Sequence, residues 1–291
     1  MINAENYFLI AIGLIWIIVA VIQDLRKREI ANWWNFSLIA AALSYRAFVS
    51  LWAGNYWYFL NGLIGFAIFF GLAYGFYYGR VFAGGDAKLL MALGAVLPFS
   101  GLFSDNLTIF LYFVILFLLC GSIYGLVYSF GLALKNRKAF AAEFVRQARK
   151  QKKIFITFLV LALVFSIFVM VMEEFIFLLF SLCVFLFPFL YCYAKAVEEV
   201  CLIKEKKARE LTVGDWLYKP VKIGKKLIKP NWEGLSEEEL RLLQRYRGKV
   251  LIKEGIPFTP SFLFAFLILI WIIQKDIVKA ISFSSIFMAF P

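Results

Sequence analysis

The sequence contains no histidine and little charge. Charged side chains make up 17% of its 291 residues, and its four cysteines show no C-x-x-C spacing. The ligands of an ordinary zinc site are therefore missing. We expect no metal, no cofactor and no disulfide. We interpret the thiols as small apolar side chains: Cys120, Cys183, Cys192 and Cys201.

Polar surface is scarce as well. Hydrophobic residues make up 63% of the chain and aromatic residues 19%, and the mean hydropathy is +0.81. A soluble protein needs a polar shell, which most of this chain does not offer. Several apolar stretches reach the roughly 20 residues that cross a bilayer. These properties exclude an ordinary soluble enzyme and predict a polytopic membrane protein.

The predicted fold class is all-α, a transmembrane helical bundle of about eight spans, with six to eight as the expected range. Helices are expected because an open strand in lipid leaves its backbone groups unpaired. The first apolar run lacks a basic n-region and further spans follow it, so we expect it to be retained. The predicted spans are about 7–22, 36–53, 59–79, 87–103, 107–134, 154–172, 175–194 and 258–274.

Polarity divides the chain into three expected parts. Residues 1–194 form a membrane helical domain, 195–255 a cytoplasmic polar segment, and 256–291 the last span with an interfacial tail. The polar segment holds fifteen basic and ten acidic residues, and we expect it to lie on anionic headgroups. Within it, Ser236 and Glu239 have the spacing of a capping box, which predicts the start of a short soluble helix.

The formal charge of +12 follows the positive-inside rule and does not indicate nucleic-acid binding. Between the predicted spans, 28 of the 31 basic residues fall on alternate connectors, which assigns those connectors to the cytoplasm. The N-terminus is then outside. The opposite connectors are 54–58, 104–106 and 173–174, and none holds a basic residue. Membrane lipids are expected partners, and nucleic acid is not.

Arg46 lies inside the second predicted span, 36–53. Its simplest interpretation is a snorkelling side chain that reaches the outer interface. A role in an ion pathway or in gating is the alternative.

Two aspartates, Asp24 and Asp86, each lie at the end of an apolar segment on the predicted cytoplasmic side. An ionisable residue at membrane depth is a candidate for function, and paired carboxylates suggest shared acid/base chemistry. Separately, each has a plainer interpretation. Asp86 can be the N-cap of a helix that starts at Ala87, and Asp24 an interfacial acid beside Arg26 and Arg28.

Packed helices lie about 8–10 Å apart, so the two carboxyls can flank one water. They would then share one proton. The ionised partner can take a proton from water while the protonated one donates to a scissile carbonyl, which is the chemistry of aspartic proteases. Gly84 and Gly85 would let a substrate strand approach Asp86, by close contact or by a positive φ.

Three segments resemble motifs of type IV prepilin peptidases. Asp24-Leu-Arg-Lys-Arg-Glu-Ile-Ala-Asn32 is similar to the family's aspartate, basic residues and Ile-Pro-Asn. Ala83-Gly-Gly-Asp86-Ala-Lys88 resembles G-x-G-D with its following lysine, and Gly255-Ile-Pro-Phe-Thr-Pro260 resembles Ile-Pro-Phe-x-Pro. The motifs occur in order over most of the chain, and the match is closest to the archaeal branch, which includes preflagellin peptidases.

The resemblance implies an aspartic endopeptidase that cuts the short basic leader, a class III signal peptide, from pilin-like or flagellin-like precursors at the cytoplasmic face. By resemblance, Asp24 and Asp86 are the catalytic dyad, and Gly84, Gly85 and Asn32 shape the loops. Lys88 is expected to anchor its helix to headgroups.

Two residues depart from the family pattern, because Ala31 replaces a proline and Ala83 replaces the first glycine of G-x-G-D. Both changes concern loop geometry. The cysteine-rich zinc region of bacterial members is missing, so we expect no methyltransferase activity.

Three rival functions remain open. A presenilin-type G-x-G-D protease would carry Tyr-Asp and Pro-Ala-Leu motifs, whereas here Gln23 precedes Asp24 and Ile256-Pro-Phe holds the late position. A proton- or cation-coupled transporter would use the same aspartates but would need polar residues at mid-membrane. In a non-enzymatic assembly protein the aspartates would be replaceable. The sequence does not select among pilin-like, flagellin-like and sugar-binding-protein precursors.

Overall fold

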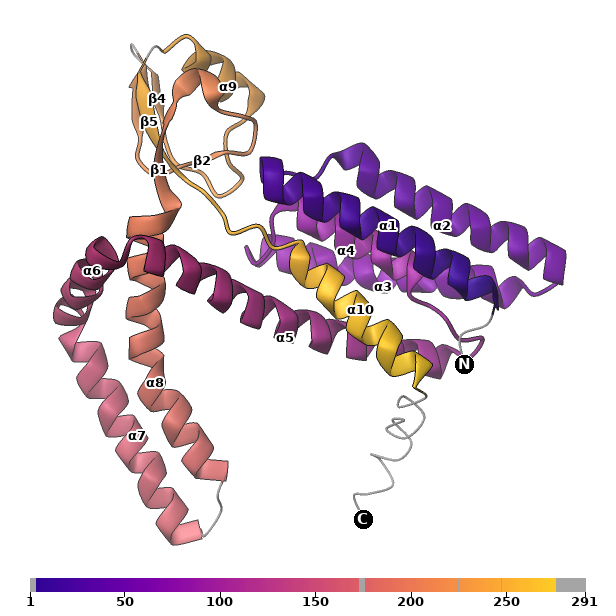
Figure 1. Ribbon diagram of the computed structural model, residues 1–291, viewed down its shortest axis with the longest axis horizontal. Helices are drawn as coiled ribbons and strands as arrows, with labels where there is room; N and C mark the ends of the chain where they lie inside the picture. The colour runs from indigo at the N-terminus through magenta and orange to yellow at the C-terminus, as the bar shows by residue number, and fades with distance from the viewer. Residues whose placement is uncertain (1–3, 173–175, 224–225, 247, 276–291) are drawn as a thin grey trace. The chain divides into compact units, whose positions relative to one another are not determined.

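Helices make up most of the computed structural model, which describes residues 4–172, 176–223, 226–246 and 248–275 (Figure 1). The chain forms two compact units. The first comprises Met1–Leu126 with Pro257–Pro291, and the second comprises Val127–Ile256. The predicted connector at 173–174 and the predicted tail at 276–291 lie outside the described residues.

The first unit is a bundle of helices around one buried helix, α4. Most of α4 is buried, and its apolar side chains pack with a group of phenylalanines that includes Phe113, Phe117 and Phe266. Helix α10 packs on α1 although the whole chain separates them in sequence (Figure 1). The helices are α1 (Ala4–Lys27), α2 (Asn32–Ala53), α3 (Tyr56–Tyr78), α4 (Gly84–Val96), the first part of α5 (Phe103–Lys135) and α10 (Pro260–Gln274).

Glycines let α3 and α4 approach closely where they cross. A Cβ added to Gly65 would lie 2.3 Å from the Gly94 carbonyl oxygen, and a Cβ on Gly94 would lie 2.6 Å from the Gly65 carbonyl oxygen. Any larger residue would push the two backbones apart. This contact sets the depth of α4 in the bundle.

Arg46 does not snorkel. Its side chain is fully buried and donates hydrogen bonds to the backbone carbonyls of Ala95 (2.8 Å), Val96 (3.1 Å), Pro98 (2.6 Å) and Tyr58 (3.2 Å). The last carbonyls of a helix have no partner within it, so the guanidinium caps the C-terminal end of α4, where a cation is also favoured by the helix dipole. The snorkelling interpretation was wrong because carbonyls inside the bundle satisfy this charge.

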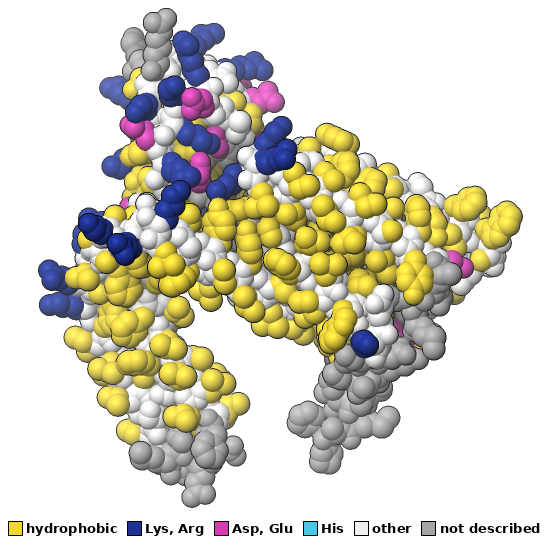
Figure 2. Space-filling model, viewed as in Figure 1, with side chains coloured by type: hydrophobic (Ala, Val, Ile, Leu, Met, Phe, Trp, Pro, Cys, Tyr) yellow, Lys and Arg dark blue, Asp and Glu magenta, His cyan; other side chains and the backbone are white. Residues whose placement is uncertain are grey.

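The all-α membrane fold is confirmed, with fewer long spans than predicted. Five described helices are long and apolar enough to cross a bilayer, and α6 with α7, bent by 72°, makes a sixth if counted as one span. Helix α4 has 13 residues, or about 20 Å at 1.5 Å per residue, so it is shorter than a span. The prediction over 87–103 was too long because the helix ends at Val96. Figure 2 shows apolar side chains over the visible face of the first unit, as expected for a surface in lipid.

The second unit joins long helices to a small polar domain. The end of α5 is followed by α6 (Arg137–Lys150), α7 (Lys152–Met172), α8 (Ile176–Val197) and the short π-helix η1 (Glu198–Leu202). The polar domain then contains β1 (Ile203–Lys207), η2 (Ala208–Glu210), β2 (Trp216–Leu217), β3 (Val221–Ile223), β4 (Lys226–Ile228), α9 (Glu237–Gln244) and β5 (Lys249–Lys253).

This polar domain has its own sheet and core. Strands β1, β5 and β2 form an antiparallel sheet in that order, with Glu205 opposite Leu251, while β3 and β4 pair separately. The predicted capping box of Ser236 and Glu239 is confirmed at the start of α9. The strands were not predicted because short segments rich in lysine do not show a clear alternation of polar and apolar residues. Lys and Arg side chains cover much of this domain (Figure 2).

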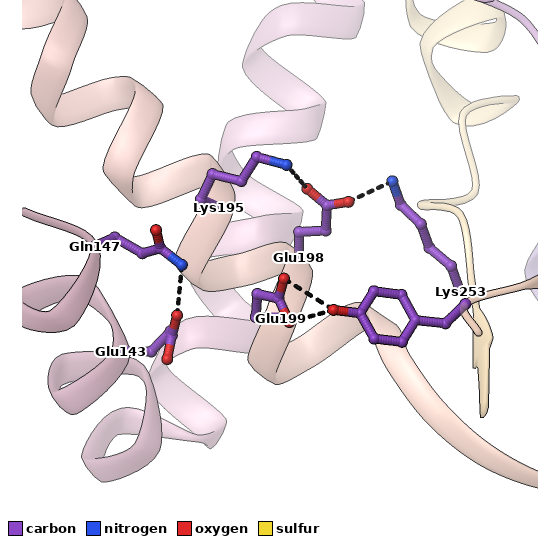
Figure 3. A network of polar contacts seen from close by, with 7 residues as sticks. Glu143, Gln147, Lys195, Glu198, Glu199 and Lys253 are labelled. Carbon is purple, nitrogen blue, oxygen red and sulfur yellow. Dashed lines mark hydrogen bonds and ion pairs between the residues drawn. The ribbon is translucent and has the colours of Figure 1, made fainter. Parts of the chain in front are cut away.

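A polar network ties the domain to the end of α8. Glu198 accepts from Lys195 at 2.8 Å and from Lys253 of β5 at 2.6 Å (Figure 3). Glu199 accepts from the Tyr218 hydroxyl at 2.9 Å. The three parts predicted from the sequence, with boundaries at 194–195 and 255–256, were defined by the polarity of the chain, whereas the two compact units are defined by which residues pack together. The polarity-based division therefore stays a prediction.

Candidate active site

Asp24 lies near the C-terminal end of α1 and is buried, with 7% of its surface exposed. Its Oδ2 atom accepts two hydrogen bonds from Thr259, one from the backbone N–H at 3.0 Å and one from the hydroxyl Oγ1 at 2.6 Å. Helix α1 ends soon after, where Arg28 takes a φ of 59°. The end of α1 and the start of α10 thus meet at this carboxylate.

Thr259 is fully buried and immediately precedes α10, whose first residue is Pro260. The first N–H groups of a helix have no partner within it, and a carboxylate at that end is favoured by the helix dipole. Asp24 therefore supplies from another helix the acceptor that the start of α10 needs. Threonine was the variable position of Ile-Pro-Phe-x-Pro, so the motif located the segment but did not single out the residue.

Asp86 lies in the first turn of α4 and is half-buried. The charge of Asp24 and the side chain of Thr259 both act on its carboxyl. The fold thus brings together the two aspartates that the sequence singled out. The N-cap interpretation of Asp86 was wrong, because α4 begins at Gly84 and its N-cap is Ala83.

The surroundings of Asp86 favour its neutral form. Asp86 lies outside the helices long enough to span the membrane. Burial first, and then the neighbouring Asp24 carboxylate, raise its pKa to about 7, although the side chain of Thr259 acts in the opposite direction. A carboxylic acid that holds its proton near neutral pH can donate that proton to a reacting group.

Gly84 and Gly85, which precede Asp86, have ordinary backbone angles, and Gly85 allows a close contact with Ile30. Close approach and a positive φ were the two alternatives for Gly84 and Gly85. Among the described glycines a positive φ occurs at Gly54, Gly214 and Gly234, so the second alternative does not apply. A Cβ on Gly85 would touch Ile30 at 3.4 Å, whereas one on Gly84 would meet only a ring carbon at 3.8 Å. The close approach here joins α4 to the loop that follows Asp24.

Asn32 also connects that loop to α4. Its Oδ1 accepts a hydrogen bond from the Lys88 ammonium at 2.6 Å. Lys88 thus binds the first residue of α2, while its expected contact with headgroups stays a prediction. Asn32, Gly85 and Asp86 therefore belong to one local cluster, while the predicted contact of the glycines with substrate stays a prediction.

Two further residues of this cluster had not been predicted. Gln23 accepts from the Ala31 N–H at 2.9 Å, a bond that proline could not make because it has no N–H. The departure from the family's proline therefore has a local use. Asn35 is fully buried and donates from Nδ2 to the Gly85 carbonyl at 3.2 Å, and its Oδ1 has no partner among the described residues. An amide in an apolar run, one turn after Asn32, was the available signal.

The comparison with known proteins covers the part of the chain that holds both aspartates. Residues 11–130 match the model of the Type IV leader peptidase family. Three curated relatives are each called preflagellin peptidase. They are 33% identical over 87 residues in Methanocaldococcus jannaschii, 36% over 90 in Methanococcus voltae and 35% over 88 in Methanococcus maripaludis.

Each of these alignments covers 30% of this chain and 37% of the relative. The chain therefore matches little more than a third of the length of these proteins, and Thr259 lies beyond the segment that matches the family. The several long apolar helices agree with a multi-pass membrane protein. Residues 11–130, a range that includes Asp24 and Asp86, are similar to the type IV leader peptidase family.

Proposed function

We propose that this protein is a membrane aspartic endopeptidase that removes the short basic leader from pilin-like or flagellin-like precursors. The observation that carries the proposal is the electrostatic interaction between Asp24, near the C-terminal end of α1, and Asp86, in the first turn of α4. The match of residues 11–130 to the leader peptidase family model supports the proposal, because both aspartates lie in the matched range.

The pair can hydrolyse a peptide bond without a covalent intermediate. The ionised carboxylate takes a proton from water while the water oxygen attacks the scissile carbonyl carbon, and the protonated carboxyl gives its proton to the carbonyl oxygen. The resulting diol then collapses and the C–N bond breaks. The leaving nitrogen takes the proton first removed from water, and a diol hydroxyl returns one to the other carboxyl.

The substrate class and the membrane side are parts of the same proposal. The relatives are named for preflagellin, and the distribution of basic residues supports a cytoplasmic site with the N-terminus outside. A class III signal peptide has its cut next to an apolar helix, which suits carboxyls at the end of α1. Anionic lipids are proposed to contact the basic surface of the polar domain.

The test is a cleavage assay on membranes that contain the full chain. Wild type, Asp24→Asn and Asp86→Asn are each incubated with one pilin-like and one flagellin-like precursor, and the product N-terminus is sequenced. Asp105→Asn is the matched control, because Asp105 is an exposed aspartate that accepts from Ser100 at 2.8 Å and lies away from the pair.

The proposal expects a cut just before the apolar helix with wild type and with the control, and none with either dyad variant. Substantial cleavage by Asp24→Asn or Asp86→Asn would exclude the dyad. Loss of the protein from the membrane, without a specific loss of activity, would indicate a structural role for the aspartates.

A further inference from the structure

The contact between Asp24 and Thr259 is asymmetric. Both donors of Thr259, the backbone N–H at 3.0 Å and the hydroxyl at 2.6 Å, bind the same oxygen, Oδ2. The described part of the chain shows no hydrogen bond to Oδ1. One oxygen of this carboxylate is therefore occupied by protein, and the other is left for a reacting group.

Two donors on Oδ2 leave Oδ1 as the oxygen of this carboxylate that can accept a proton from a reacting group. They also hold the carboxylate plane in one orientation, because the N–H belongs to the start of α10 and cannot turn away. Asp86 differs, since it is half-buried in the first turn of α4 and its carboxyl is influenced by the charge of Asp24. The two carboxyls therefore have unlike surroundings.

The neighbours of Thr259 hold it in place. Phe258 packs against the rings of Phe82 and Phe117, with centroids 6.0 and 5.5 Å apart. A Cβ on Gly121 would lie 2.4 Å from the Phe258 ring, so that ring fills the space the glycine leaves. Because an aromatic anchor on one side and Pro260 on the other fix this short segment, the Thr259 donors have one position relative to α1.

We propose that Thr259 is the positioning residue that assigns the two roles of the dyad, with Asp24 as general base through Oδ1 and Asp86 as general acid. This inference rests on the proposed peptidase function. Water gives its proton to Asp24 Oδ1 as its oxygen attacks the scissile carbon, and Asp86 gives its proton to the carbonyl oxygen. Thr259 itself exchanges no proton and, being fully buried, does not touch the substrate.

The test uses an isosteric pair in the full-length protein. Thr259→Val keeps the shape and the backbone N–H but removes the hydroxyl, and Thr259→Ser keeps the hydroxyl. A hydrogen bond to a charged group is strong enough for its loss to lower kcat by about 10- to 100-fold. KM should stay within about twofold of wild type, and the serine variant should recover kcat to within about threefold.

Ser261→Ala is the matched control. Ser261 is also fully buried, and its hydroxyl donates to the Phe258 carbonyl rather than to Asp24. If Thr259→Val and Ser261→Ala lowered kcat alike, general packing at the start of α10 would explain both, and the inference would be overturned. Wild-type kcat in Thr259→Val would overturn it as well, as would a serine variant no better than valine.

These outcomes are separate from a failure of the peptidase proposal. That proposal fails if Asp24→Asn or Asp86→Asn still cleaves, whatever Thr259 does. If Thr259→Val does not accumulate in the membrane, Thr259→Ser still tests the inference. A large fall in the kcat of Thr259→Ser, with a normal amount of protein, would contradict a role that depends on the hydroxyl.

Discussion

Replacing Arg46 by methionine removes the charge that caps α4 while it keeps most of the length of the side chain. In the folded protein the guanidinium donates to the carbonyls of Ala95, Val96 and Pro98 and to that of Tyr58, over 2.6 to 3.2 Å. Methionine cannot donate to any of them. The carbonyls at the end of α4 would then be buried without partners.

The expected cost is large. A buried polar group left without a partner costs about 1–3 kcal/mol, and removing one side of a buried charged arrangement costs roughly 3–5 kcal/mol. Because the carbonyls around Arg46 form one group, their costs do not simply add. We expect the free energy of unfolding of the first unit to fall by about 3–5 kcal/mol.

The assay is thermal unfolding of the purified protein in detergent, followed by tryptophan fluorescence. For a unit of this size each kcal/mol lowers Tm by about 2–4 °C, so the expected decrease is on the order of 10 °C. Arg149→Met is the control, because Arg149 is an exposed arginine of α6 and an exposed charge contributes little. An unchanged Tm in Arg46→Met would refute the capping argument and return the residue to the snorkelling interpretation.

Two other perturbations follow from the geometry. Burial and Asp24 raise the pKa of Asp86 to about 7, so this acid loses its proton above pH 7. We therefore expect kcat/KM to fall about tenfold per pH unit above pH 7. A kcat/KM that stays constant from pH 6 to 9 would contradict the role of Asp86 as the acid. Gly94→Ala should lower Tm and activity together, because the new Cβ would lie 2.5 Å from the Phe69 Cβ. Gly71→Ala in α3 is the control, because a Cβ there meets nothing within 4 Å; its Tm and activity should stay unchanged. Equal losses of Tm and activity in the two variants would exclude the close crossing of α3 and α4 as the cause.

The elements that depend on local sequence were predictable. Long apolar runs predicted the membrane helices, since lipid admits no unpaired backbone, and Ser236 with Glu239 predicted the start of α9. Asp24 and Asp86 stood out because charge at the end of an apolar run is unusual. The motif that ends at Pro260 pointed to the segment that closes the site, although not to the residue within it that does so.

Tertiary structure decided what each polar side chain does. Arg46 could not be assigned because its partners are carbonyls of another helix, about 50 residues away in the chain. Thr259 meets Asp24 across 235 residues, and no local pattern records such a contact. Local hydropathy and charge were thus enough to predict the membrane helices and to single out the two carboxyls. The asymmetry of the dyad and the depth of α4 arise only in the folded chain, because hydrogen bonds and helix packing depend on which segments meet.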